Sequence, residues 1–489
     1  MQKQTAGTIL ALLLIFVGGL RLIFALSEPT LAFEGYQHAL FLSHLQEEGT
    51  PLRENPLSYS GREHLYNPIF YYLLLPFSFI IGIELTLKII PNLIYLSTIF
   101  FVFLLARDIS KNNFASIIAA LFAGLGTLSF SQHINSASPY TLISPLFLLC
   151  LYALLEPKKR LLTLILTTTI LGLLSPSIFL LVAGLIMYLV IIALEKMTVD
   201  REHVEALFFM SFFSLWSLLI TYKDALINQG FNAFFIFLPS NVFLEEYSRA
   251  PLIIAIALIG VLPALLGMIA AYQGLFVRRN KKVFLLLGVL FATIISVLLR
   301  ITPFEIGLAF MTFILAVLSA QVIKYLHNYF EKTKFSHLRI PSMTLLILFF
   351  VITSIFPAVS YAANIDTPSQ EHLLLVQELE RGRTVLASTK EGFFFQYHGF
   401  RTITDTDFLN VVHIEEQHEI AQELYRARFM LSALEHTDAL GIHYIVLSPQ
   451  VSEQFSRDEL LFVNNNCFRR VFNETTIQAY EVNCHVQTR

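Results

Sequence analysis

Long, uninterrupted runs of apolar residues constrain this 489-residue chain more than any other feature. A helix needs about 20 predominantly apolar residues to cross the hydrocarbon core of a bilayer. Ten such runs and a shorter run that ends at Ser175-Pro176 predict eleven membrane-spanning helices. The predicted spans are 8–26, 86–106, 114–131, 139–155, 161–174, 177–195, 204–222, 251–273, 283–299, 304–326 and 340–360.

The composition agrees with a polytopic α-helical membrane protein. Hydrophobic residues make up 55% of the chain and charged residues 14%, against about 25% charged in an average soluble domain. A water-soluble protein of this size could not bury so much apolar surface. The same excess excludes a disordered chain and a secreted disulfide scaffold. A net charge of −3 without a basic tract excludes a nucleic-acid partner.

The distribution of Lys and Arg predicts the topology. Cytoplasmic loops carry an excess of these residues. The stretch Asn67–Ile83 is apolar, but it contains Pro68 and Pro76 and suits a membrane-surface or re-entrant element. If it does not cross, 16 basic residues fall on the cytoplasmic side and six in the outer loops before residue 361. We therefore predict a multi-pass protein of the cell membrane with a cytoplasmic N-terminus and an extracytoplasmic C-terminus.

This topology predicts two domains. Residues 1–360 form the membrane domain, with a long outer loop at 27–85 and a second outer loop at 223–250. Residues 361–489 form an extracytoplasmic α/β domain. Its pattern predicts a helix near 370–381, a strand at 384–388, a helical stretch near 409–436, a buried strand at 441–447 and a hairpin of 467–472 with 476–482.

Two cysteines bracket this last hairpin. Cys467 and Cys484 are predicted to form a disulfide, because the compartment outside the membrane permits oxidation. The pairing register would then set Arg470 opposite Glu481, a favourable cross-strand pair. The alternative is two free thiols in a different register. The glycan acceptor sequon Asn473-Glu474-Thr475 is expected to be exposed on the turn.

The first outer loop carries the most informative motifs. They read Glu34-Gly35-Tyr36-Gln37-His38, then Pro56 to Arg62, then Asn67 to Tyr72, and Ile89-Ile90-Pro91-Asn92 opens the next span. In order and spacing they resemble the GT-C superfamily of polyprenyl-phosphate-sugar-dependent glycosyltransferases, and most closely the archaeal oligosaccharyltransferases. There, motifs of the types Asp-Pro-Tyr-Tyr-His, Pro-Leu-Ser-Tyr-Gly-Gly-Arg, Pro-Pro-Leu-Phe-His-Tyr and Arg-Leu-Pro-Ser occur in this order.

The resemblance implies a GT-C-like fold and a glycosyltransferase. Such an enzyme moves a sugar or glycan from a polyprenyl-phosphate-linked donor to a protein, lipid or glycan acceptor on the extracytoplasmic side. The acceptor loses a proton as it attacks, and a carboxylate near the membrane serves as base. Glu34 fits that role. A cation must neutralise the leaving lipid phosphate. The residues predicted to bind substrate are Tyr36, His38, Arg53, Arg62 and Arg300.

The chain departs from the family pattern at two places. Glu34 stands where the family usually has Asp. The loop Ser131–Pro139 lacks the carboxylate that often binds a metal in the family, which counts against a divalent cation. His38 and His133, together with Glu34, are the candidate ligands if a cation is present. No other cofactor is predicted.

Two other functions stay open. A catalytically degenerate relative could bind lipid-linked glycan without transferring it, and the two departures favour this alternative. A lipid-substrate transporter would need charged residues along its spans. The spans after Arg21 are nearly free of charge, which counts against a transporter.

Overall fold

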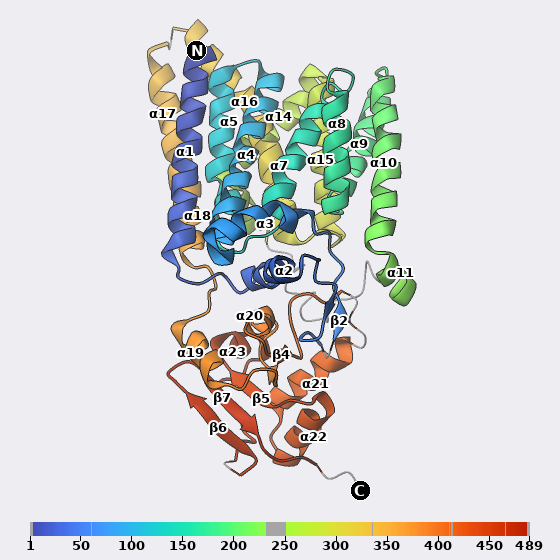
Figure 1. The fold of residues 1–489 in the computed structure, drawn as a ribbon. Helices are drawn as coiled ribbons and strands as arrows, with labels where there is room; N and C mark the ends of the chain where they lie inside the picture. The colour runs from blue at the N-terminus through green and yellow to red at the C-terminus, as the bar shows by residue number, and fades with distance from the viewer. Residues whose placement is uncertain are drawn as a thin grey trace. The chain divides into compact units, whose positions relative to one another are not determined.

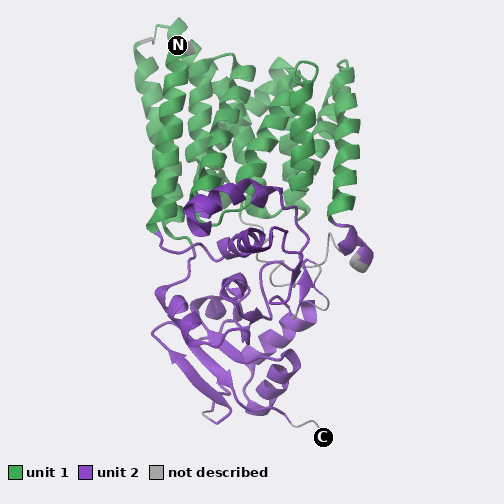
Figure 2. Cartoon of the chain, in the orientation of Figure 1, with its two compact units in different colours: residues 1–27, 88–221, 245–365 green, residues 28–87, 222–244, 366–489 purple. Residues whose placement is uncertain are grey.

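The computed structural model describes residues 3–59, 61–230, 251–334, 336–409, 411, 414–464 and 466–486. The chain divides into two compact units (Figure 2). Unit 1 comprises Met1–Ser27, Lys88–Thr221 and Glu245–Ile365, and unit 2 comprises Glu28–Leu87, Tyr222–Leu244 and Asp366–Arg489. Most of the predicted outer loop 223–250 lies outside the described residues. The predicted domain boundary at residues 360/361 stays a prediction.

Unit 1 is a bundle of helices (Figure 1). Its helical segments are α1 (Lys3–Ser27), α4 (Ile83–Ser110, whose first turn belongs to unit 2), α5 (Asn113–Leu125), α6 (Thr127–Ser131), α7 (Tyr140–Leu154), α8 (Leu161–Leu174), α9 (Ile178–Leu194), α10 (Arg201–Thr221), α13 (Leu252–Ile259), α14 (Val261–Tyr272), α15 (Lys281–Leu298), α16 (Phe304–Lys332), α17 (Arg339–Phe350) and α18 (Phe356–Ala363). Short π-helical and 3₁₀ segments join them at Gln273–Arg278, Ser336–Leu338 and Val351–Ile355.

The predicted spans are helical, and the polytopic membrane fold is confirmed. Among the described residues, seven helices are long and apolar enough to cross a membrane. Four further predicted spans correspond to the shorter apolar helices α5, α7, α8 and α9. Two predicted spans are broken. Gly126 separates α5 from α6, and Gly260, at φ +100°, separates α13 from α14. Gly126 is extended, at φ −62° and ψ 147°, whereas Gly260 has a positive φ, which glycine adopts without steric cost.

Helix α16 lies at the centre of unit 1. Its apolar stretch of 18 residues is 94% buried. Helices α5, α14 and α15 pack around it. Helices α9 and α15 approach each other closely at Gly184 and Gly288. A Cβ atom at Gly288 would meet the backbone of α9, so these two helices pack on bare backbone. Small residues at helix contacts are typical of membrane bundles.

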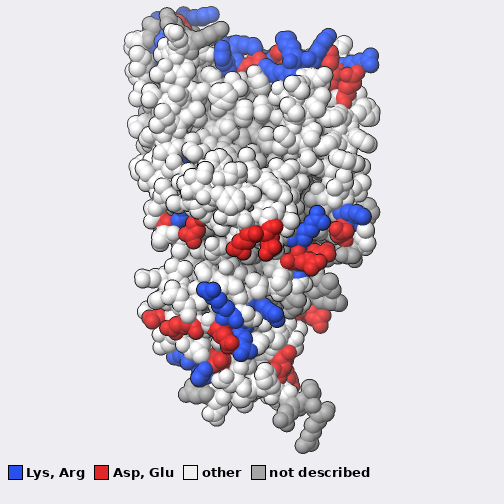
Figure 3. Space-filling view, in the orientation of Figure 1, with Lys and Arg blue, Asp and Glu red and all other residues white. Residues whose placement is uncertain are grey.

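Basic side chains gather at one end of unit 1 (Figure 3). Ion pairs there join the last turn of α4 to the N-cap of α8 and the first turn of α15, since Arg160 and Lys282 both bind Asp108, at 2.9 and 3.1 Å. Helix α1 begins at this same end (Figure 1). These basic loops therefore share one end of the bundle, as the charge distribution predicted. Which face of the membrane this end occupies stays a prediction.

Unit 2 combines the loop after α1 with the C-terminal tail. Its elements are α2 (Gly35–Glu48), β1 (Glu54–Asn55), β2 (Arg62–Glu63), α3 (Ile69–Ile81), α11 (Lys223–Gln229), α19 (Gln370–Glu378), β3 (Thr384–Leu386), α20 (Gly392–Tyr397), β4 (Arg401–Thr402), α21 (Ile414–Arg426), α22 (Met430–Leu440), β5 (Tyr444–Leu447), α23 (Pro449–Phe455), β6 (Phe468–Asn473) and β7 (Gln478–Val482). The predicted helical stretch near 409–436 is two helices, α21 and α22.

The tail is built on a five-stranded mixed sheet of order β4-β3-β5-β7-β6. Strands β4, β3 and β5 are parallel, and β7 is antiparallel to β5 and β6. Strand β5 is buried along its whole length. Because a parallel strand covered on both faces reads as a continuous apolar run, its sequence predicted it well.

The predicted disulfide between Cys467 and Cys484 is present. The predicted register is wrong by one residue. Arg469, not Arg470, lies opposite Glu481 and forms an ion pair with it. The N–H of Asn483 donates to the carbonyl of Cys467 at 2.8 Å, so Cys484 lies one residue beyond the position opposite Cys467. The sequon Asn473–Thr475 is exposed, as predicted.

Candidate active site

Glu34 is the residue immediately before α2. Its backbone already has helical angles, φ −60° and ψ −32°, and its side chain is exposed and makes no capping hydrogen bond. Its neighbours are buried: Phe33 and Tyr36 are each 2% exposed. The N–H of Phe33 also donates to the carbonyl of Asp366, at 3.3 Å. Glu34 is therefore an exposed carboxylate whose backbone is held in place on both sides.

Tyr36 anchors this end of α2 against the tail. Its ring meets Phe394 edge-on at 5.1 Å and packs 5.5 Å from Tyr397, with both distances between ring centroids. Phe394 and Tyr397 belong to α20. Such aromatic contacts add to the free energy of burial. Tyr36, predicted to bind substrate, therefore holds α2 on α20.

His38 is buried one turn further along α2. Its Nδ1 lies 2.8 Å from the hydroxyl of Tyr71 on α3, within hydrogen-bond distance. Burial lowers the pKa of His38 to about 4, so the imidazole is neutral near pH 7. The residue joins α2 to α3 within unit 2.

The two arginines of the loop have different surroundings. Arg53 is exposed, and its side chain makes no hydrogen bond or ion pair with another described residue. Arg62 is buried, and its Nη2 lies 3.1 Å from Oδ1 of Asp405 and 3.3 Å from Oδ2 of Asp407. Burial favours the protonated form of Asp407, but Arg62 and the hydrogen bond with His64 outweigh it and lower its pKa to about 2. Arg62 is thus balanced by two carboxylates.

Asp405 is the centre of a buried hydrogen-bond network that the sequence did not reveal. Its carboxylate is fully buried and accepts hydrogen bonds from Ser58 Oγ at 2.6 Å and Gln396 Nε2 at 2.7 Å, besides Arg62. Its backbone N–H donates to the hydroxyl of Tyr59, at 3.0 Å. Three residues of the predicted motif Pro56–Arg62 therefore attach the loop to the tail.

Backbone pairing reinforces this attachment. The N–H of Thr402 in β4 donates to the carbonyl of Leu57 at 2.7 Å, and the N–H of Tyr59 donates to the carbonyl of Thr402 at 3.0 Å. Ser58 and Thr402 form a parallel bridge beside the five-stranded sheet. About 340 residues separate these partners in sequence, so no local signal could have predicted the contact.

A cavity of about 480 Å³ lies in unit 2 beside α2. Gln46, Tyr397 and the turn Ile81–Leu85, which includes Glu84, line it. At 1.5 Å rise per residue, Gln46 lies about 18 Å along α2 from Glu34. Tyr397 connects the two places, because its ring also packs on Tyr36. Glu34 therefore lies at the N-terminal end of α2, and the cavity lies near the C-terminal end of the same helix.

Two predicted residues belong to unit 1. Arg300 lies in the turn between α15 and α16, is half-buried and has φ +58°. Since α15 begins at the basic end of the bundle, Arg300 lies at the opposite end. His133 follows α6, has φ +58° and stacks on Tyr140, with ring centroids 5.9 Å apart.

Arg21 stabilises this part of unit 1. It is buried in α1, and its Nε donates to Oδ1 of Asn92 at 2.8 Å. Its Nη atoms donate to the carbonyls of Ser129, Phe130 and Gln132 at the end of α6. A cation at a helix C-terminus satisfies carbonyls that lack a helical partner. Asn92, from the motif Ile89–Asn92, also donates to the carbonyl of Ile134, at 2.7 Å.

The side chains do not assemble a metal site among the described residues. No three His, Cys, Asp or Glu side chains in that part of the chain could hold one ion together. His38 is buried against Tyr71, and His133 is stacked on Tyr140.

The fold is similar to those of known membrane glycosyltransferases. No protein-family model and no curated protein matches the sequence. The apo oligosaccharyltransferase of Archaeoglobus fulgidus matches with a TM-score of 0.71 and 12% identity, over 92% of this chain and 70% of that one. AglB from the same organism, in complex with an inhibitory peptide and a dolichol-phosphate, matches with a TM-score of 0.67 and 12% identity over 89% and 69%.

A solved structure from another organism has a similar fold. ArnT from Cupriavidus metallidurans, bound to undecaprenyl phosphate, matches with a TM-score of 0.55 and 11% identity over 98% of each chain. At such identities the likeness shows the fold, which is a GT-C fold of the oligosaccharyltransferase type. The resemblance predicted from the loop motifs is confirmed at that level.

Proposed function

We propose that this protein is a membrane glycosyltransferase that moves a sugar or glycan from a polyprenyl-phosphate-linked donor to an acceptor on the extracytoplasmic side. The GT-C fold supports the proposal. The two transferases with similar folds were solved with dolichol-phosphate and undecaprenyl phosphate, and both ligands are polyprenyl phosphates. The proposed acceptor is a protein, a lipid or a glycan.

The observation that carries the proposal is the placement of Glu34. An exposed carboxylate directly before α2 is held between buried neighbours, so it needs little rearrangement to meet an acceptor. As general base, Glu34 would take the proton from the acceptor nucleophile as that nucleophile attacks the anomeric carbon. The bond from that carbon to the phosphate oxygen breaks, and the polyprenyl phosphate leaves.

The leaving phosphate needs a cation. We assign this role to Arg53 or Arg300. Arg62 suits it less, because Asp405 and Asp407 beside its guanidinium would repel a phosphate. We assign Tyr36 and His38 to holding α2, since both side chains are buried.

A transfer assay with purified protein and labelled polyprenyl-phosphate sugar tests the proposal. Glu34→Gln keeps the shape of the side chain but removes its basicity. We expect transfer to fall by at least ~100-fold, the usual scale for a general base. Donor binding should persist, because Glu34 does not hold the phosphate.

Two further variants make the test specific. Glu34→Asp should retain part of the activity, because it keeps the carboxylate. Glu63→Gln, an exposed carboxylate of the same loop, should transfer at the wild-type rate. A Glu34→Gln variant that transfers at nearly the wild-type rate would overturn the assignment of the base.

The second candidate function is donor binding without transfer. It is favoured by the carboxylate-free segment Ser131–Pro139 and by Glu34, which stands where the family usually has Asp. The same assay separates the two functions. The wild-type protein would then retain the labelled donor but form no product with a protein, a lipid or a glycan acceptor. That result would favour donor binding without transfer.

A further inference from the structure

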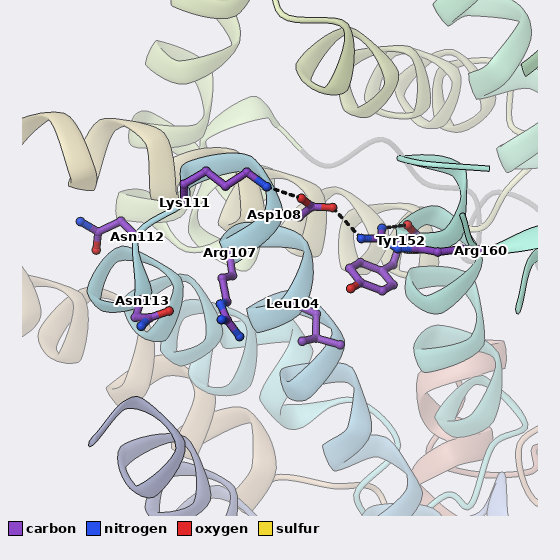
Figure 4. Close-up of a pocket in the computed structure, with 8 residues that line it drawn as sticks. All are labelled: Leu104, Arg107, Asp108, Lys111, Asn112, Asn113, Tyr152 and Arg160. Atoms are coloured by element: carbon purple, nitrogen blue, oxygen red, sulfur yellow. Dashed lines mark hydrogen bonds and ion pairs between the residues drawn. The ribbon is translucent and has the colours of Figure 1, made fainter. Parts of the chain in front are cut away.

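The basic end of unit 1 contains a cavity that the proposed transfer reaction does not use. Its volume is about 520 Å³, within the usual range for ligand pockets. It lies where α4 meets α5 and where α7 meets α8 (Figure 4). The residues that line it are Leu104, Arg107, Asp108, Lys111, Asn112, Asn113, Tyr152 and Arg160. Three of them are cations and one is an anion.

Two of the cations are fixed by contacts with neighbouring residues. Arg160 donates to Oδ2 of Asp108 at 2.9 Å and to the carbonyl of Tyr152, and its guanidinium lies 3.6 Å from the centroid of the Tyr152 ring. Lys111 donates to Oδ1 of Asp108, at 2.6 Å. These contacts hold Arg160 and Lys111 in place before any ligand arrives, which lowers the entropy cost of binding.

Asp108 does not neutralise its surroundings. Lys282 also binds Asp108, at 3.1 Å, so this one carboxylate serves three cations. Lys282 is shared with Glu156. The positive charge around the cavity therefore exceeds the negative charge.

The guanidinium of Arg107 has hydrogen-bond donors available for a ligand. It is half-buried and lines the cavity, and its side chain makes no hydrogen bond or ion pair with another described residue. Figure 4 shows its side chain turned away from the ion pairs of Asp108. Asn112 accepts a hydrogen bond from the N–H of Ala115 through its Oδ1, so its amide N–H groups are left to donate. Guanidinium groups and amides together suit a phosphate.

We propose that this cavity binds the phosphate of an anionic membrane lipid. Because α4 is long and apolar enough to span a membrane, its end lies at headgroup depth. Leu104 and the ring of Tyr152 offer apolar surface beside the cations. Basic pockets between membrane helices are known to take phospholipid headgroups. By the charge distribution, this lipid belongs to the cytoplasmic leaflet.

Native mass spectrometry of the full-length protein, extracted from nanodiscs of mixed phosphatidylglycerol and phosphatidylcholine, tests the proposal. The wild-type protein should retain phosphatidylglycerol in preference to phosphatidylcholine. Arg107→Gln should reduce that retention at least ~5-fold, the scale for one basic residue at a membrane surface. Lys332→Gln is the matched control, because it removes one exposed charge at the same end without lining the cavity.

A second arm identifies the source of the phosphate. Calorimetry of the protein in neutral detergent with inorganic phosphate should show much weaker binding than the lipid. Tight binding of inorganic phosphate that Arg107→Gln abolishes, without lipid retention, would overturn the membrane source. Equal retention of both lipids, or equal losses in Arg107→Gln and Lys332→Gln, would overturn the site. The Arg107→Gln variant must elute as a folded, monodisperse peak. If it does not, Lys111→Gln takes its place and should reduce the retention of phosphatidylglycerol in the same way.

Discussion

Asp405 links segments of unit 2 that are distant in sequence. Its carboxylate accepts hydrogen bonds from Ser58 and Arg62 in the loop and from Gln396 in α20. Tyr59 exchanges hydrogen bonds with its backbone, although the φ of Tyr59, +48°, is unfavourable for a bulky side chain. The loop that carries Glu34 therefore depends on one buried carboxylate of the tail.

We predict that Asp405→Asn destabilises unit 2. The change leaves the buried charge of Arg62 with Asp407 as its partner carboxylate, and breaking a buried ion pair costs about 3–5 kcal/mol. The midpoint of thermal unfolding should fall, and the loop 49–66 should become sensitive to protease. Asp458→Asn, at an exposed carboxylate of the same tail, should leave both unchanged. Equal midpoints for the two variants would contradict the prediction.

His38 gives unit 2 a predictable dependence on pH. The ordinary pKa of His is 6.5, and burial lowers that of His38 to about 4. Below pH 6.5 the unfolded chain binds a proton that the folded protein excludes. Stability is therefore highest above pH 6.5, falls as the pH drops toward 4, and levels off below 4 for this group.

The His38→Asn variant should remove this contribution. The difference in unfolding free energy between wild type and variant should shrink by roughly 3 kcal/mol between pH 7 and pH 4. Thermal unfolding at several pH values measures it. Gln37→Asn, a change on the same helix without a titrating group, should follow the wild-type curve. A constant difference between wild type and His38→Asn across this range would show that His38 does not titrate as described.

At the scale of elements, the contact between α9 and α15 leaves no room for a larger residue at Gly288. A Cβ at Gly288 would lie 2.4 Å from the carbonyl oxygen of Gly184 and 2.8 Å from the backbone nitrogen of Tyr188. Backbone atoms cannot move aside as a flexible side chain does. The two helices must therefore separate to admit even a methyl group.

We predict that Gly288→Ala destabilises the helical bundle. Overpacking of a close contact typically costs about 1–3 kcal/mol. The unfolding midpoint in detergent should fall by several degrees. Gly19→Ala is the control, since nothing lies within 4 Å of a Cβ built there. If Gly288→Ala unfolds at the wild-type temperature, the contact between α9 and α15 is looser than described.

At the scale of the whole molecule, the orientation in the membrane is the main prediction to test. Lys111 lies at the basic end of unit 1, and Gln370 opens α19 in the tail. The charge distribution predicts that Lys111 faces the cytoplasm and Gln370 the outside. Single cysteines at these positions should react with a membrane-impermeant reagent from opposite sides. The native cysteines interfere little, because Cys150 is buried and the other two form a disulfide.

The same experiment tests the 67–83 stretch. Helix α3 has 13 residues and contains Pro76. It packs on α2 within unit 2, through Tyr71 against His38 and Phe41. If α3 crossed the membrane and the N-terminus stayed cytoplasmic, the two sides would be exchanged: the cysteine at Lys111 would react from the outside and the one at Gln370 from the cytoplasm. That result would overturn the eleven-span topology.

The sequence by itself determined the features that depend on local physics. The length of an apolar run decides whether it forms a membrane helix, and charges at its ends decide which loops share a side. The hairpin β6–β7 and its disulfide follow from short-range alternation and two nearby cysteines. The order of the motifs between Glu34 and Asn92 was enough to indicate the GT-C fold, which the solved structures confirm.

Only the tertiary structure decided the features that depend on distant partners. Arg62 reads as a phosphate ligand in the sequence, but Asp405 and Asp407 meet it from 343 and 345 residues away. The register of β6 against β7 depends on packing against the sheet, so the cysteines alone misplaced it by one residue. The cavity at Arg107 likewise forms only where the ends of α4 and α7 come together. Long-range contacts of this kind leave no local pattern, because a side chain's own sequence neighbours do not specify its partner.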